Sequence, residues 1–199
     1  MGRKAQHRSA LLRAAQDLLR QRGFRAMAVA DVLALSGAPR GSLYHHFPEG
    51  KVALAAAAVK ASGEAVRRHL LRLALRYPKP EAFFRAYGEA LGDWMAASNF
   101  RDGCPLATVM LEAASEEPSL QSIGQAAFVS WQAVFAALFR DAGESAAGAE
   151  ARALRCLATV EGALLLARVQ QSPELLRTLV AACGENHRPS RAAEDSAHE

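Results

Sequence analysis

The chain of 199 residues lacks the features that mark several classes of protein. Its three cysteines, Cys104, Cys156 and Cys183, are scattered, and no CxxC or Cys/His spacing predicts a zinc site. An odd number of cysteines without a signal peptide favours a reducing cytoplasm over a disulfide-bonded fold. The longest apolar runs, such as 52–59, fall well short of the roughly 20 residues that cross a membrane. We therefore expect a cytoplasmic protein without a membrane partner.

The sequence also lacks the groupings that carry catalysis. We find no nucleophile–base grouping, no spacing of metal ligands and no glycine-rich loop that would cradle a phosphate. His45 and His46 are adjacent on a predicted helix, where their side chains diverge by about 100° and poorly share one metal. A regulator or binding protein is therefore expected, without a cofactor or metal, and a helical enzyme is the rival class.

No segment alternates between apolar and polar residues as a half-buried strand does, whereas apolar residues recur at helical spacing over most of the chain. Hydrophobic residues make up 51% of the sequence, which is ample for a packed core. The chain is therefore predicted to be all-α. The helices are expected at 9–22, 29–36, 40–46, 51–76, 80–98, 105–115, 118–141, 147–170 and 173–183.

The most informative segment is 31–47, which predicts two short helices joined by a tight turn. Gly37 stands where the first helix must end, and glycine adopts the left-handed turn conformation at low cost. Pro39 follows, with φ already set for a new helical turn. Two short helices around such a turn form a helix-turn-helix, whose second helix enters the DNA major groove. Its core is expected to contain Val32, Leu35, Leu43 and Phe47.

The basic residues are concentrated on the same part of the chain. Residues 1–51 contain 9 Lys or Arg and 3 Asp or Glu, a balance of +6, whereas the remaining 15 basic and 17 acidic residues give −2. This excess is typical of a surface that meets DNA, and a solvated basic surface is the alternative. Residues 1–8 are expected to be a mobile basic arm, and Gly23 to end the first helix.

The same segment resembles a known family. Gly23-Phe24, Val29, Asp31-Val32, Ser36-Gly37, Gly41–Phe47 and Lys51 match the DNA-binding domain of TetR-family transcriptional regulators, densely over residues 8–54. The sequence of residues 36–48 is similar to that of the LmrA-like subgroup, and residues 103–106 and 160–168 resemble this subgroup more weakly. The resemblance implies a helix-turn-helix domain at 1–50 and a helical ligand-binding and dimerisation domain at 51–184. The polar and charged composition of 185–199 predicts a disordered tail.

Base-edge contacts should read the DNA sequence and phosphate contacts should fix the register. Arg40 begins the second helix and can donate two hydrogen bonds to a guanine edge or a phosphate. In the family, the positions of Tyr44, His45 and Lys51 contact the groove or phosphates. The predicted DNA-binding residues are Arg40, Ser42, Tyr44, His45, His46 and Lys51, with packing against the next helix as the alternative for His46.

One departure from the family pattern concerns a helix cap. Ala28 stands where the family usually has Thr or Ser, so a capping hydroxyl is missing at a cost of roughly 1 kcal/mol.

The second domain is expected to hold a dimer interface and a pocket. Small and branched residues share faces of two late helices, and the resemblance implies the same location for a homodimer interface: Leu157, Ala158, Gly162, Leu165, Leu166, Leu176 and Leu179. Bulky, polarisable residues are candidates for the pocket wall, with plain core packing as the alternative: Trp94, Phe100, Cys104, Met110, Phe128, Trp131 and Phe135.

Two polar groups of this domain are left with open roles. Glu161 lies in an apolar stretch and is either a ligand anchor or an interface partner of Arg168 or a neighbouring helix. Cys104 is either a pocket residue or a redox-sensing thiol at a helix start.

The complete hypothesis is a homodimeric repressor that binds double-stranded operator DNA and is released by a small-molecule effector of unknown identity. A regulator that recruits a partner protein, or an activator, is the alternative.

Overall fold

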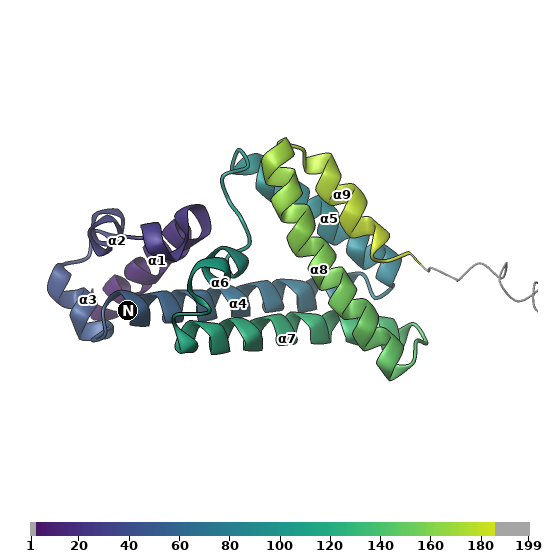
Figure 1. Ribbon diagram of the computed structural model, residues 1–199, viewed down its shortest axis with the longest axis horizontal. Coiled ribbons are helices and arrows are strands. Elements are labelled where there is room, and N and C mark those ends of the chain that lie inside the picture. Colours follow the sequence, from purple (N-terminus) through teal and green to yellow (C-terminus); the bar gives the residue numbers. More distant parts are fainter. Residues whose placement is uncertain (1–2, 186–199) are drawn as a thin grey trace, which may run out of the picture.

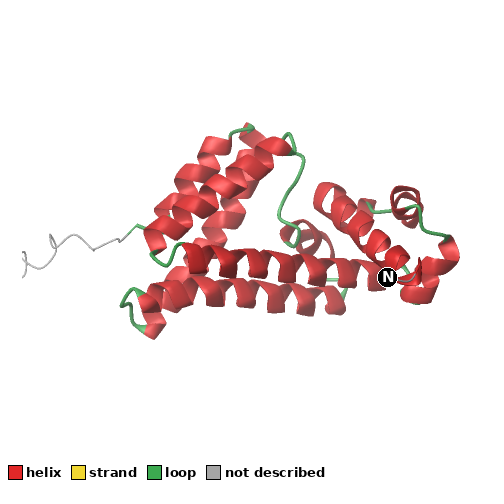
Figure 2. Cartoon of the chain, turned by 180° about the vertical axis from the view of Figure 1, so that it is seen from behind, coloured by secondary structure: helices red, strands yellow, loops and turns green. Residues whose placement is uncertain are grey.

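The structure, a computed structural model, describes residues 3–185, and within that range the chain forms helices and no strands (Figures 1 and 2). A small unit of three helices lies at one end of an elongated molecule, and a larger helical unit forms the rest. The helices are α1 (Arg3–Ala26), α2 (Val29–Ser36), α3 (Arg40–His46), α4 (Lys51–Arg76), α5 (Pro80–Ala97), α6 (Ala107–Ala113), α7 (Pro118–Asp141), α8 (Ala146–Gln170) and α9 (Pro173–Ala182).

The helix-turn-helix forms at the predicted position. Gly37 has φ 63° and ψ 10°, and its N–H donates to the carbonyl of Leu33 at 3.0 Å, so α2 ends in a left-handed turn. Pro39, with φ −61° and ψ 145°, is the residue from which α3 starts. The hydroxyl of Ser36 accepts the N–H of Ala38 at 3.2 Å and so satisfies one backbone donor inside the turn.

The core of the small unit contains Val32, Leu43 and Phe47, as predicted, but Leu35 is 58% exposed. The inward face of α2 is centred on Val29, Val32, Leu33 and Ser36. At 3.6 residues per turn, Leu35 lies roughly 110° from the middle of that face, so its side chain points to solvent. The prediction for Leu35 was therefore wrong.

Helix α1 begins six residues earlier than predicted. Residues 3–8 are helical, so the part of the expected mobile arm that the structure describes is instead a turn and a half of α1. The carbonyl of Lys4 lies 3.1 Å from Nε2 of His46, which ties this extension to α3. At the other end Gly23 has φ 80° and ψ −177°, so the helical path breaks there, as predicted.

The larger unit is organised around long helices that lie side by side. Helix α4 runs beside α7, α8 crosses α7, and α9 covers α5 (Figure 1). The last pair packs closely, because a Cβ added at Gly88 would lie 3.1 Å from the carbonyl oxygen of Arg177. Residues 105–106 form a turn before the short α6. Of the predicted tail, 186–199 lie outside the described residues.

Helix α7 contains an apolar 18-residue window and is, by length and composition alone, able to cross a membrane. In the structure it packs against both α4 and α8, and its Trp131, Phe135 and Phe139 are buried. The ring centres of Phe84 and Phe139 are 5.7 Å apart in a stacked pair. The apolar composition of α7 is thus explained by its place in the core.

Candidate DNA-binding surface and ligand cavity

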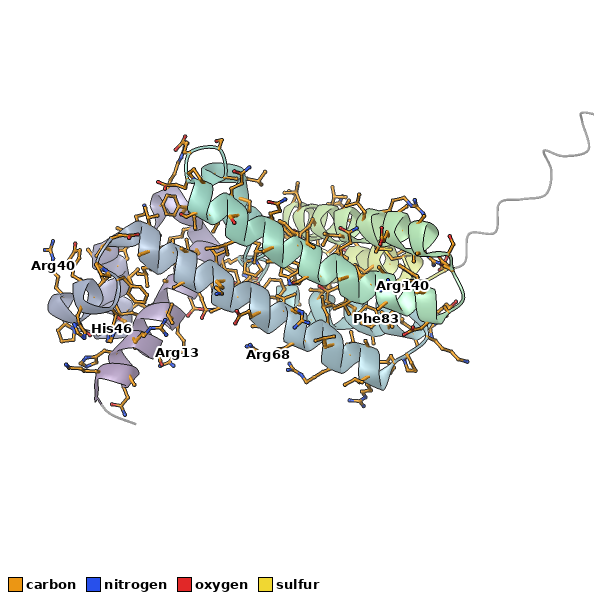
Figure 3. The ribbon with its side chains drawn as sticks, turned by 90° about the horizontal axis from the view of Figure 1, so that it is seen from below. Arg13, Arg40, His46, Arg68, Phe83 and Arg140 are labelled. Atoms are coloured by element: carbon orange, nitrogen blue, oxygen red, sulfur yellow. The ribbon has the colours of Figure 1, made fainter. Side chains whose placement is uncertain are left out.

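Helix α3 presents a polar face at the end of the molecule (Figure 3). The side chains of Arg40, Tyr44 and His45 are exposed, and the Arg40 guanidinium lies 5.9 Å from the centre of the Tyr44 ring. Ser42 and His46 are half-buried. Because Arg40 and Tyr44 are four positions apart, they share one side of the helix. This side offers a guanidinium and a phenol to a groove edge or a phosphate.

Two of the predicted DNA contacts also bind within the chain. His46 meets the Lys4 carbonyl, while Nζ of Lys51 donates to the carbonyl of Arg25 at 3.1 Å and lies 4.6 Å from the centre of the Phe24 ring. His46 therefore ties α1 to α3, and Lys51 ties the end of α1 to the start of α4. A phosphate contact from Lys51 would come from its backbone N–H at the start of α4.

The start of α2 lacks a side-chain cap, as the sequence predicts. Ala28 occupies the capping position with φ −83° and ψ 144°, and no side chain accepts the first N–H groups of the helix.

A cavity of about 510 Å³ lies where α1, α4, α5, α7 and α8 meet. This volume is within the range of sites that enclose a small molecule. Most of the lining is apolar and the polar groups gather on α1, α4 and α8. The lining residues are Arg13, Gln16, Asp17, Arg20, Ser62, Ala65, Val66, His69, Tyr87, Ala90, Leu91, Trp94, Cys104, Pro105, Trp131, Val160, Glu161 and Leu164.

Three of the seven predicted pocket residues line this cavity: Trp94, Cys104 and Trp131. The other four residues do not line the cavity, and each of them lies in a different part of the larger unit. Phe135 is 1% exposed and packs in the core against Phe83 and Phe84, with ring centres 5.9 and 5.1 Å away.

The remaining three lie elsewhere on the larger unit. Phe128 borders a separate, shallower hollow between α7 and α8. Met110 fills the space beside Gly124, and Phe100 is half-buried in the loop after α5. Helical spacing identified these side chains as inward-facing but not which of them meet the cavity.

Glu161 and Cys104 form a polar pair on the cavity wall. Oε2 of Glu161 is buried and has no hydrogen-bond partner among the described residues. Burial raises the pKa of Glu161 to about 7, and the hydrogen bond with the Cys104 thiol lowers it only partly. The Cys104 pKa is raised well above its ordinary value, first by burial and then by Glu161. Cys104 is therefore a buried neutral thiol, which argues against the redox-sensing role.

The pKa values of two other groups at the cavity, Tyr87 and His69, are shifted toward the neutral form. Tyr87 is buried, and burial, followed by Glu161, raises its pKa, so the phenol stays protonated. Burial, followed by the charge of Arg72, lowers the pKa of His69. The ring of Trp131 is fixed because its Nε1 donates to the carbonyl of Gly63 at 2.9 Å.

The cavity wall includes part of the small unit, because α1 supplies four of its residues. Arg20 of α1 lies 2.9 Å from Oδ2 of Asp102, which is buried in the loop before α6. Gln16 of α1 donates to the hydroxyl of Ser62 on α4 at 3.0 Å. The two units thus meet through polar contacts at the rim of the cavity.

A second junction links α6 to the break at Gly23. The carboxylate of Glu112 accepts a hydrogen bond from the backbone N–H of Arg25 at 2.8 Å and lies directly beside Gly23. Glu116 pairs with the Arg25 guanidinium at 2.6 Å. A side chain at position 23 would collide with the Glu112 carboxylate. The end of α1 is therefore joined to the larger unit through its backbone.

The sequence matches two family descriptions. Residues 11–58 match "Bacterial regulatory proteins, tetR family", and residues 80–182 match "Transcriptional regulator LmrA/YxaF-like, C-terminal domain". The chain belongs to the TetR family. It is similar to the uncharacterized HTH-type transcriptional regulator Rv0196 of Mycobacterium tuberculosis, with 38% identity over 159 residues, covering 77% of this chain and 80% of that protein.

Two further TetR-family relatives extend the comparison. The HTH-type transcriptional regulator LmrA of Bacillus subtilis is 28% identical over 159 residues, covering 80% of this chain and 85% of that protein. The crystal structure of regulatory protein TetR from Rhodobacter sphaeroides has a TM-score of 0.79 at 25% identity and covers 88% of this chain and 96% of that one. The predicted family, subgroup and all-helical fold are confirmed, and the chain is a DNA-binding transcriptional regulator.

TetR-family regulators act as dimers, and α8 carries an exposed apolar strip that suits such a contact. Leu165 is 63% exposed and Leu166 43%, and nothing lies within 4 Å of a Cβ added at Gly162. Ala158 is exposed as well.

The other predicted interface leucines lie deeper. Leu157 and Leu176 are buried within the chain, and Leu179 is half-buried. Leu176 is fully buried within the single chain, on the helix that packs against α5. Leu157 borders the hollow between α7 and α8.

Sequence reasoning missed three acidic residues that join the units of this TetR-family chain: Asp102, Glu112 and Glu116. Their partners on α1 lie more than 80 residues away in the sequence, so no local spacing identifies the pairs. Glu161 carried the only signal, a carboxylate in an apolar stretch of α8. In the structure Glu161 lines the cavity and also borders the shallower hollow between α7 and α8.

Proposed function

We propose that the chain is a ligand-responsive repressor that binds a palindromic operator as a homodimer and releases it when a small apolar or aromatic molecule occupies the cavity. The observation that carries this proposal is the shared wall of the cavity, to which the DNA-binding unit contributes Arg13, Gln16, Asp17 and Arg20 of α1. A molecule in that space touches both units directly.

In this proposal α3 lies in the major groove. Arg40 and Tyr44 contact base edges or phosphates from one side of the helix, with His45 beside them, while the half-buried Ser42 permits a close approach. The exposed strip of α8 supports pairing of two chains. Two copies of α3 then meet successive major-groove faces roughly 34–36 Å apart.

Release follows if the ligand favours a different position of α1. A ligand shifts the equilibrium between two conformations only by its difference in affinity for them. Ligand that displaces Arg20 from Asp102, or Gln16 from Ser62, moves α1 relative to α4. The separation of the two α3 helices in the dimer changes accordingly, and the affinity for the operator falls.

The test is binding to the duplex immediately upstream of the chain's own gene, with excess unrelated DNA, at two salt concentrations. Specific binding survives the competitor and weakens steeply as salt rises. We expect Tyr44→Ala to lower the affinity about tenfold or more, since a base or phosphate contact is lost. The matched control is Arg140→Ala, at an exposed position near the end of α7, far from α3 (Figure 3).

Full-strength DNA binding by a folded Tyr44→Ala protein would contradict the assigned surface. A screen of compounds by thermal unfolding then tests the ligand, since a molecule that binds the folded state raises its apparent stability. A cavity that takes no compound would favour a regulator that instead recruits a partner protein.

A further inference from the structure

Among the described residues that line the cavity, two buried side-chain polar atoms lack a hydrogen bond, and of these Arg20 Nε is ion-paired with Asp102 while Oε2 of Glu161 has no ion pair either. Oε2 is buried and no donor of the described residues reaches it, while the neighbouring Cys104 supplies a single weak thiol donor to the carboxyl group. A buried acceptor without a donor is unfavourable in the empty protein and becomes favourable when a bound molecule supplies the hydrogen bond.

The charges around the cavity make the position of Glu161 electronegative. At the rim, Arg20 is paired with Asp17 at 3.1 Å and with Asp102 at 2.9 Å. His69 on α4 is shifted toward its neutral form, and Arg13 on α1 is exposed to solvent. The group left without a partner inside the cavity is therefore a carboxyl group rather than a cation, and a bound cation would favour its ionised form.

Three aromatic side chains share the wall of the cavity with Glu161. Trp94, Trp131 and Tyr87 come from α5 and α7, and the indole of Trp131 is fixed through its hydrogen bond to Gly63. Aromatic faces attract a cation and also cover an apolar ring. A carboxylate with indole rings nearby is thus complementary to a molecule with a positive head and an apolar body.

We infer that the effector is an amphipathic amine, whose protonated nitrogen donates to Glu161 and whose apolar body lies against Trp94 and Trp131. The inference rests on the proposed function, because it names the chemical class of the ligand that occupies the same cavity. It excludes carboxylic acids and other anions as effectors, because these would bring a second negative charge next to Glu161.

The test uses three probes with the same body and different heads: phenylbutylamine, phenylbutanol and phenylbutyrate. The two tryptophans of the chain, Trp94 and Trp131, both line the cavity, so their fluorescence reports its occupancy. Excitation at the red edge of the indole absorption avoids the phenyl group of the probes. We expect the amine to bind about tenfold or more tightly than the alcohol, as one charge-assisted hydrogen bond predicts, and the acid to bind weakest.

Two variants identify the group that selects the amine. Glu161→Gln keeps the size of the side chain and removes the charge, so the preference for the amine over the alcohol should shrink to within about twofold. Glu150→Gln, at an exposed position of the same helix, should retain the preference. Thermal unfolding of both variants confirms that they are folded.

Each other result overturns the inference. Equal binding of amine and alcohol, tighter binding of the acid, no binding of any probe, or an unchanged preference in folded Glu161→Gln would each do so. The effect of the amine on DNA binding separates this inference from the proposed function. If the amine binds through Glu161 but leaves the affinity for DNA unchanged, the chemistry of the site stands and the ligand-responsive repressor fails. If an uncharged compound releases the DNA, the repressor stands and the amine fails.

Discussion

Glu161→Gln should change how the stability of the protein depends on pH. Burial raises the pKa of Glu161 from 4.5 to about 7, so the folded state binds a proton more tightly than the unfolded chain does. A group of this kind favours the folded state below pH 4.5, and its contribution is lost as the pH rises through about 7. The wild-type protein therefore loses stability over this window, whereas a glutamine at the same position does not titrate.

The size of the effect follows from the shift. The pKa of Glu161 rises by 2.5 on folding, from 4.5 to about 7, and this rise corresponds to a full change of about 3 kcal/mol in the free energy of unfolding. Most of it, about 2 to 3 kcal/mol, should appear between about pH 5 and about pH 8 as a falling free energy of unfolding of the wild type relative to Glu161→Gln. Cys104 and Tyr87 stay protonated in this range because their pKa values are raised.

The assay is urea unfolding of both proteins at several pH values and one protein concentration, since dimerisation makes stability depend on concentration. The exposed Glu150→Gln variant controls for a change in net charge. A difference between wild type and Glu161→Gln that stays constant across the window would refute the buried, unpartnered state of this carboxyl group.

Three further substitutions test separate parts of the structure. Asp102→Asn removes one of the two acidic partners of Arg20 and leaves only Asp17. We expect the free energy of unfolding in urea to fall by about 2 kcal/mol. Unchanged stability would show that the pair of Arg20 and Asp102 is not formed in solution. Ala28→Thr supplies the missing cap of α2 and should raise the stability by about 1 kcal/mol, and a destabilised variant would contradict the capping geometry. Leu165→Glu places a charge on the exposed strip of α8 and should convert dimers to monomers in sedimentation analysis, whereas an unaltered dimer would place the interface elsewhere.

Local sequence signals predicted most of the fold. The start of α3 and the ends of α2 and α4 followed from residues that act on their own neighbourhood, such as Gly37, which takes φ 63°. The failures came where a local signal was weak. Helix α1 begins at Arg3, where the carbonyl of Lys4 meets His46 from 42 residues away, and nothing in the basic segment itself indicates that contact.

The site was less predictable than the fold, because it depends on which faces meet. Trp94 and Trp131 line the cavity, whereas Phe135 has the same residue class and the same helical spacing and lies in the core. The pair of Arg20 and Asp102 has no signal in the sequence, since each residue alone resembles a solvated surface charge. Glu161 was the exception: a carboxylate in an apolar helix needs an explanation wherever it lies.

The most direct test of the account is selection of duplex DNA from a random-sequence pool by the full-length protein, followed by a measurement of how many chains bind the selected site. The account predicts an enriched inverted repeat with half-sites roughly 34–36 Å apart, or a multiple of this, bound by chains in pairs and not enriched by Tyr44→Ala. A pool that remains random, or a selected site that holds a single chain, would contradict it.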